Sequence, residues 1–138
     1  MKTLNSQLKR FDNDIKKRVN RFKINFAKTI LLLLVERTPV DTSTALSNWI
    51  VGLSKKKDRK IEAHRIGVNG STQGISAGVT MSLGGAIIQR AKVGEIVYIT
   101  NNVDYIELLN MGYSTQAERH YIQRCVADAV EQMKRERL

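Results

Sequence analysis

Few residues of this chain are of types that catalyse reactions, and they are scattered. There is one cysteine, Cys125, and there are two histidines, His64 and His120. A catalytic thiol needs a neighbouring base, and nothing in the spacing brings either histidine to Cys125. We therefore interpret Cys125 as a buried structural residue. Because a single cysteine cannot form an internal disulfide, we expect a chain that folds in a reducing compartment.

One pair of carboxylates has a spacing that fits acid–base chemistry. Asp104 and Glu107 are three residues apart and would be neighbours on a helix. An aspartate in the first turn of a helix is equally well explained by the helix dipole. The sequence contains no phosphate-binding loop, nucleophile elbow, His-Glu-x-x-His or Cys-x-x-Cys. We therefore expect a protein that is not an enzyme and that uses no cofactor or metal.

Positive charge is concentrated in two places. The chain of 138 residues has a formal charge of +10. Residues 1–37 hold ten Lys or Arg against three Asp or Glu, and residues 55–65 hold six against two. Clustered cations suit contact with phosphates, but a solvated helix face and a charged loop explain them as well, since no aromatic residue interrupts 55–60. The candidates for contact with DNA or a subunit are Lys55, Lys56, Lys57, Arg59 and Lys60.

The first predicted element is a long amphipathic helix. Its apolar residues recur with spacings of four and three that average eleven residues per three turns, so the stripe stays nearly straight along the helix. Apolar residues surround the helix near its end, which predicts that its C-terminal half is the better buried. Thr38 precedes Pro39, so the helix should stop near Glu36 or Arg37. The stripe is formed by Leu4, Leu8, Phe11, Ile15, Val19, Phe22, Phe26, Ile30 and Leu33.

The remaining pattern predicts a small sheet and further helices. Asp41 and Thr42 are suited to cap a helical turn at 44–45. We expect residues 49–53 to pair antiparallel with 61–68 across the basic connection, forming a projecting hairpin. Residues 69–78 read as a flexible loop, 83–92 as a short helix, and 95–100 as a central strand.

A further helical turn is expected near 105–109, and a closing helix begins near residue 116 or 117. Together these elements predict a single α+β domain over residues 1–138, with two terminal helices packed on a small, mainly antiparallel sheet. Trp49 is interpreted as a core or subunit-interface residue, the alternative being an exposed binding anchor. The longest apolar run, residues 30–35, is far below the roughly 20 residues needed to span a bilayer, so we expect a soluble protein without a membrane partner.

Two segments resemble a known family, the small neck and tail-completion proteins of tailed bacteriophages. The first is Thr38-Pro-Val-Asp-Thr42 with Ala45, Asn48 and Trp49, which is similar to the family's Thr-Pro-Val-Asp-Thr-Gly segment that ends in Asn/Ser-Trp. The second resembles the family's strand, Asn-Asn turn and Gly-x-Ser-x-Gln-Ala-Pro loop. It comprises Val97-Tyr-Ile-Thr-Asn-Asn102, Tyr105 and Gly112-x-Ser114-x-Gln116-Ala117.

The chain departs from the family pattern at four positions. Ser43 and His120 stand where the family has glycine, Asn110 where glutamate is common, and Glu118 where proline occurs. A left-handed turn at Ser43 would be strained or remodelled, because glycine adopts that conformation at little cost.

The resemblance implies a non-enzymatic virion protein made in the cytoplasm of a bacterial host. It implies a ring of six or twelve copies around the DNA channel, in contact with head-closure or connector proteins and with tail tube or terminator proteins. The structural and interface residues that it implies are Pro39, Asp41, Thr42, Asn48, Trp49, Asn101, Asn102, Tyr105, Gly112, Ser114 and Gln116. The alternative is a basic protein that binds double-stranded DNA outside the particle.

Overall fold

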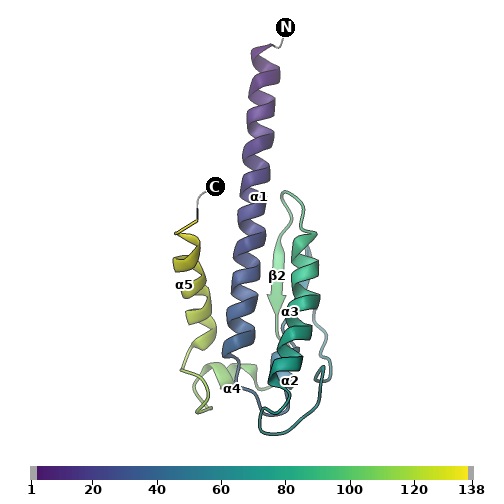
Figure 1. The fold of residues 1–138 in the computed structure, drawn as a ribbon, viewed down its shortest axis with the longest axis vertical. Coiled ribbons are helices and arrows are strands. Elements are labelled where there is room, and N and C mark those ends of the chain that lie inside the picture. The colour runs from purple at the N-terminus through teal and green to yellow at the C-terminus, as the bar shows by residue number, and fades with distance from the viewer. Residues whose placement is uncertain (1–2, 137–138) are drawn as a thin grey trace.

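The computed structural model describes residues 3–136 and is dominated by one long helix. Helix α1 spans Leu4–Arg37, a length of 34 residues (Figure 1). Thr3 caps its start, since the Oγ1 atom accepts the amide of Ser6 at 3.2 Å. Thr38 has an extended backbone, with φ −66° and ψ 126°. The helix therefore ends at Arg37, before the proline, as the sequence predicts.

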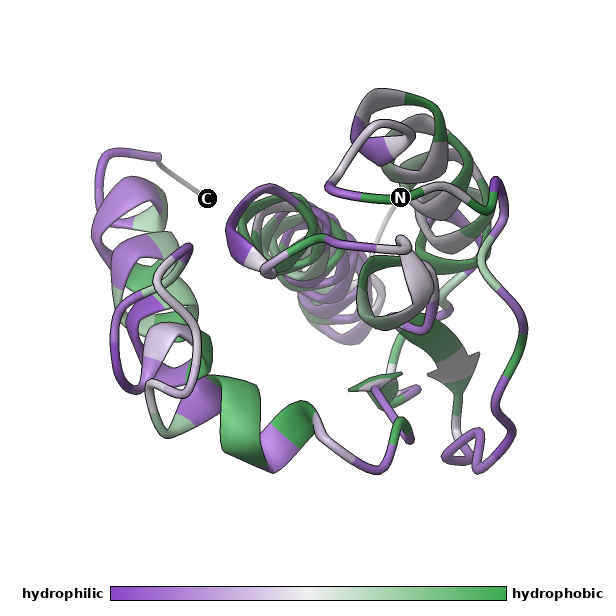
Figure 2. Ribbon diagram, turned by 90° about the horizontal axis from the view of Figure 1, so that it is seen from below, coloured by the Kyte–Doolittle hydropathy of each residue, from purple (hydrophilic) through white to green (hydrophobic). Residues whose placement is uncertain are grey.

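Two helices cover α1 on different sides. Helix α3 (Gln73–Gln89) and helix α5 (Tyr121–Met133) make the most extensive contacts with α1. Viewed along α1, α5 lies to one side of it and α3 to the other (Figure 2). Both flank the C-terminal half of α1, and the N-terminal half extends beyond them (Figure 1).

The sheet has two antiparallel strands, β1 (Ile50–Leu53) and β2 (Val97–Thr100). Their register places Ile50 opposite Thr100 and Leu53 opposite Val97. The predicted α+β class, with terminal helices and a small antiparallel sheet, is confirmed. The predicted partner of β1 is wrong, because residues 61–68 form no strand. The prediction of a central strand at 95–100 is also wrong, because among residues 3–136 β2 pairs with β1 alone.

Side-chain hydrogen bonds explain why residues 61–68 do not join the sheet. The Asn48 amide donates to the carbonyl of Ile61 at 2.8 Å, and its Oδ1 accepts the amide of Ile61 at 2.8 Å. A single side chain thus takes both backbone bonds of Ile61, and the amides of His64 and Arg65 donate to the hydroxyls of Ser47 and Ser76. Residues 55–60 fold back over β1, where a Cβ on Gly52 would lie 2.3 Å from the carbonyl oxygen of Lys55.

The shorter elements match the sequence pattern more closely. Helix α2 (Thr44–Ser47) and helix α4 (Ile106–Asn110) form where helical turns were expected. The flexible loop predicted at 69–78 is partly wrong, since α3 begins at Gln73 and ends at Gln89. The closing helix starts at Tyr121, four or five residues later than predicted, because His120 has a left-handed backbone with φ 61°.

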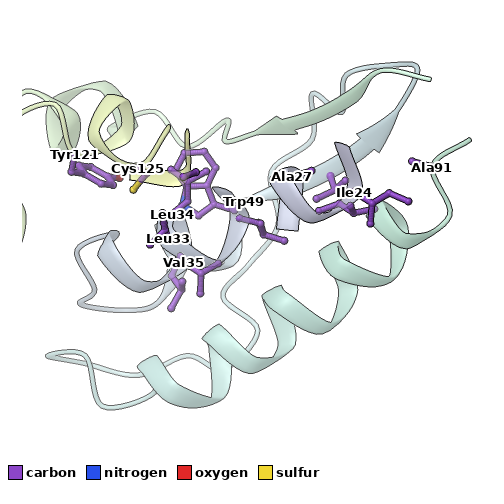
Figure 3. Packing of buried hydrophobic residues seen from close by; sticks show 14 of the residues in the cluster. Ile24, Ala27, Leu33, Leu34, Val35, Trp49, Ala91, Tyr121 and Cys125 are labelled. Atoms are coloured by element: carbon purple, nitrogen blue, oxygen red, sulfur yellow. The ribbon is translucent and has the colours of Figure 1, made fainter. Parts of the chain in front are cut away.

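The core follows the C-terminal half of α1. Leu31, Leu46, Ile88 and Cys125 are fully buried. In Figure 3, Ile24 and Ala27 lie near Ala91 at one end of the cluster, and Tyr121 and Cys125 lie beside Leu33 and Leu34 at the other. Among residues 3–136, no helix combines the length and the apolar character required to cross a membrane.

Candidate functional site

The first of the two motif segments is organised around the hydroxyl of Thr38. This Oγ1 donates to the carbonyl of Leu34 at 2.6 Å and accepts the indole N–H of Trp49 at 2.7 Å. The Tyr121 hydroxyl reaches the same atom at 3.5 Å. Thr38 and Trp49 are both buried, so these bonds satisfy polar groups that water cannot reach. Trp49 is a core residue, which confirms one of the two roles expected for it.

Two direct hydrogen bonds join the two motif segments. The backbone N–H of Val40 donates to Oε1 of Gln116 at 2.7 Å, across 76 positions of sequence. The amide of Asn101 donates to the carbonyl of Ala45 at 2.9 Å. An open cavity of about 280 Å³ lies between the segments, with Pro39 and Tyr105 among its lining residues. We call these contacts and this cavity the motif junction.

Most of the remaining motif residues hold backbone in place. Asp41 accepts the amide of Asn69 at 2.6 Å, and Thr42 bonds the hydroxyl of Thr44 at 2.9 Å. The Asn102 side chain donates to the carbonyl of Lys57 at 2.9 Å, and the Ser114 hydroxyl accepts the amide of Gln116 at 3.1 Å. Their side chains are thus committed to backbone or neighbouring polar groups within the chain.

Two positions of the motif segments have a left-handed backbone, and a third lines the cavity of the junction. Gly112 follows α4 with φ 93°, a value at which any other residue is strained. Ser43 has φ 70° and is buried, with its hydroxyl 2.9 Å from that of Thr72. Tyr105 lines the cavity and is 40% exposed, and its partial burial raises the pKa of its hydroxyl.

The cationic segment, residues 55–60, is exposed along its whole length. Its backbone is anchored, because the carbonyl of Lys57 accepts from the hydroxyl of Thr100 at 2.8 Å as well as from Asn102. Lys60 forms an ion pair with Asp104 at 3.0 Å, and the Lys56 ammonium lies 6.0 Å from the centre of the Tyr98 ring. The structure thus holds this segment against the sheet while its cationic side chains face solvent.

The residues that sequence suggested for chemistry lie in different surroundings. Cys125 is fully buried, and burial raises the pKa of its thiol more than the nearby Arg37 lowers it. His64 is half-buried, and burial lowers its pKa. Asp104 is paired with Lys60, and His120 precedes α5 in an exposed loop. Within residues 3–136, no three His, Cys, Asp or Glu side chains gather closely enough to hold a metal ion.

A second candidate surface lies on the N-terminal half of α1. Five large apolar residues there are exposed, with Phe11 at 64% and the central Ile15 at 43%. The sequence analysis found their spacing but not their exposure, because the same stripe is half-buried or buried further along the helix. We call this surface the exposed stripe; it consists of Leu4, Leu8, Phe11, Ile15 and Val19.

Other functional features were not visible in the sequence. The role of Thr38 as a shared hydrogen-bond partner depends on Trp49 and Tyr121, which are 11 and 83 positions away. Its only local signal is its place before Pro39.

Comparison with models of protein families, with curated proteins and with solved structures found no match.

Proposed function

We propose that this chain is a structural protein of the virion of a tailed bacteriophage. In this proposal it forms a ring at the neck between head and tail, or at the head-proximal end of the tail. The ring joins or completes the tail around the DNA channel, and the protein acts by assembly. Its partners are further copies of itself, head-closure or connector proteins on one side, and tail tube or terminator proteins on the other.

The observation that carries the proposal is the left-handed backbone at Ser43 and His120. Both residues stand where the resembled family has glycine, and their φ values are 70° and 61°. Glycine adopts these angles at little cost, whereas serine and histidine do so uncommonly. The fold therefore keeps, at both positions, the backbone conformation that glycine favours. This agreement supports the resemblance independently of the residues that first suggested it.

The motif junction gives further support. The two segments that carry the resemblance lie far apart in sequence, yet they meet through the Val40–Gln116 and Ala45–Asn101 hydrogen bonds. Their polar residues hold backbone, which suits a scaffold that presents surfaces to neighbours. The exposed stripe is such a surface, because large contiguous apolar patches on soluble proteins commonly mark interaction sites.

The test is electron microscopy of purified phage particles labelled with gold-conjugated antibody against this chain. The expected result is label at the junction of head and tail, together with ring-shaped particles of the recombinant protein at high concentration. Particles that carry no label anywhere would overturn the proposal.

The exposed cationic segment favours one alternative, a protein that binds duplex DNA outside the particle. Such binding should weaken steeply with salt, with each phosphate contact contributing roughly −0.9 to the log–log slope. The double variant K56E/K57E should then lose about tenfold or more in affinity. Reversing Arg90 and Arg135, which are exposed elsewhere, provides the matched control. Equal binding by both double variants would remove support for this alternative.

A further inference from the structure

The apolar stripe of α1 is symmetrical about Ile15. Counted outward from Ile15, apolar residues lie 4, 7 and 11 positions away in both directions. Toward the N-terminus these are Phe11, Leu8 and Leu4. Toward the C-terminus they are Val19, Phe22 and Phe26. Because 11 residues make three helical turns, residues 4, 15 and 26 fall in one line along the helix.

The exposed stripe also continues a face that is already covered lower down. Helix α5 packs on this face of α1, where Phe22 and Phe26 line an apolar cavity of about 160 Å³ with Val130 and Met133. Beyond the end of α5 the same face is uncovered (Figure 1). A helix that followed the line of α5 would cover the exposed stripe.

Charges beside the stripe follow an order that suits one direction of pairing. Asp12 and Lys16 lie on one edge and form an ion pair at 2.9 Å. Asp14 and Arg18, also four residues apart, lie on the other edge. Both acids precede Ile15 and both bases follow it. An antiparallel copy therefore places a base opposite each acid, whereas a parallel copy places acid opposite acid.

We propose that two copies of this chain pair through antiparallel α1 helices, with a two-fold axis at Ile15. Leu8 then packs on Phe22 of the second copy, and Phe11 packs on its Val19. Leu4 enters the apolar cavity lined by Phe26, Val130 and Met133 of the second copy. Asp12 faces the second copy's Lys16, and Asp14 faces its Arg18. The surface is self-complementary, as a two-fold contact requires.

The area available matches a modest interface. The five residues of the exposed stripe present roughly 500 Å² of apolar surface, within the size range of functional patches on monomers. Two copies, with Phe22, Phe26 and the flanking charges, bury about 1,200 Å², the lower limit of standard interfaces. The N-terminal half also gains stability, because an isolated helix of about 15 residues is marginal in water.

This pairing does not depend on the location of the protein in a particle. A two-fold contact by itself makes dimers. Dimers in solution without label on virions would leave the pairing intact and overturn the proposed function. Labelled virions together with a strictly monomeric protein would overturn the pairing and leave the proposed function intact.

The first experiment measures mass by sedimentation equilibrium of the full chain over a range of concentrations. The native protein is expected to dimerise. I15D places two carboxylates together at the axis, so it should weaken the dimer by more than about tenfold. N13D adds the same charge to the opposite side of the helix and should leave the dimer unchanged. A native monomer at all concentrations, or equal masses for I15D and N13D, would overturn the pairing.

The second experiment tests the direction of pairing. Chains carrying F11C are mixed with chains carrying V19C and oxidised; the native Cys125 is fully buried. Antiparallel pairing predicts disulfide-linked dimers in the mixture and few with either variant alone. Self-linked dimers of each variant would indicate parallel pairing and refute the model.

Charge exchange gives a further check. The variant D12K/D14K places like charges together and should dissociate, as should K16D/R18D. An equimolar mixture of these two variants should recover a dimer, as should one chain that carries all four changes. A mixture that stays monomeric would show that the flanking charges do not face one another.

Discussion

The two halves of α1 carry the same apolar stripe and have opposite surroundings. In the C-terminal half, Leu33 of the stripe is buried against other elements of the chain, and the stripe residues Phe22, Phe26 and Ile30 are half-buried. Residues on the other faces of this half are buried as well, namely Ile24, Ala27, Leu31, Leu34 and Val35. In the N-terminal half, every residue from Leu4 to Val19 is exposed. The spacing of apolar residues hardly changes between the halves. What changes is the apolar character of the remaining faces, which is high only near the end of the helix.

This difference shows what an apolar stripe on a helix does and does not indicate about the surface that packs on it. A stripe shows that a helix face is to be covered, but it does not show which chain covers it. Around Leu31, helices α3 and α5 and the sheet are all within one chain, so the core closes there. Around Ile15, the described part of the chain, residues 3–136, supplies no cover. In our interpretation a second copy supplies it.

The comparison predicts its largest effect at a matched pair of leucines. Leu31 is 0% exposed and Leu8 is 56% exposed. Leu31→Ala should lower the free energy of unfolding by about 2–5 kcal/mol, because it removes buried methyl groups and leaves a cavity. Leu8→Ala should change it by about 0.5 kcal/mol or less. Urea unfolding in the monomeric I15D background measures both without a contribution from dimerisation. Equal losses would mean that the N-terminal half packs against its own chain.

A second effect of slightly smaller size is expected at Thr38. Thr38→Val keeps the shape but removes the oxygen that accepts the indole N–H of Trp49. A buried donor without a partner costs about 1–3 kcal/mol. Trp49 is the only tryptophan, so its fluorescence reports the change directly. Thr38→Ser retains the hydroxyl and serves as the control. If valine and serine behaved alike, the hydrogen bond would contribute nothing measurable.

The sequence predicted the long helix and its end because both depend on local rules. Regular spacing fixes the helical face, and Pro39 prevents a helical Thr38. The burial of Cys125 and Trp49 followed from their chemical type. Similar local patterns predicted helical turns at 44–45 and near 105–109, but the cap expected from Asp41 or Thr42 does not form, because no side chain caps α2.

The sheet pairing could not be predicted, because it depends on contacts distant in sequence. Residues 61–68 have strand-like composition, but the Asn48 side chain takes the ladder bonds at Ile61. The actual partner of β1 lies beyond α3. The start of α3 was also missed, because Gly74 and Gly78 lower helix propensity and interrupt the apolar pattern. The resemblance named residues of the two motif segments, but it did not predict that the segments meet.

Helix α3 offers a third test, at neighbouring glycines. A Cβ on Gly84 would lie 2.6 Å from Cδ2 of Leu31, whereas a Cβ on Gly85 would meet no atom within 4 Å. Gly85→Ala should therefore stabilise the protein by about 0.5–1 kcal/mol, because glycine is unfavourable within a helix. Gly84→Ala should be less stable than Gly85→Ala by about 1–3 kcal/mol through overpacking. Thermal unfolding of the two variants measures this difference in stability. Equal stability would mean that the Leu31 side chain adjusts to the added Cβ without measurable cost.

The smallest expected effect concerns pH and again separates the body of the protein from the exposed half of α1. Burial lowers the pKa of His64 in the folded state below its usual value of about 6.5. The unfolded chain therefore binds a proton at a higher pH than the folded chain does. Stability is lost as pH falls from about 6.5 toward the lowered value, and it is regained as pH rises.

His64→Gln should reduce this dependence of the unfolding free energy on pH. The segment from Leu4 to Val19 contains no histidine, so I15D should retain the native slope between about pH 5.5 and 7. Urea unfolding at several pH values gives both slopes. If I15D flattened the slope and His64→Gln did not, the pH sensitivity would belong to the dimer contact, and the division of α1 into a self-contained half and a pairing half would need revision.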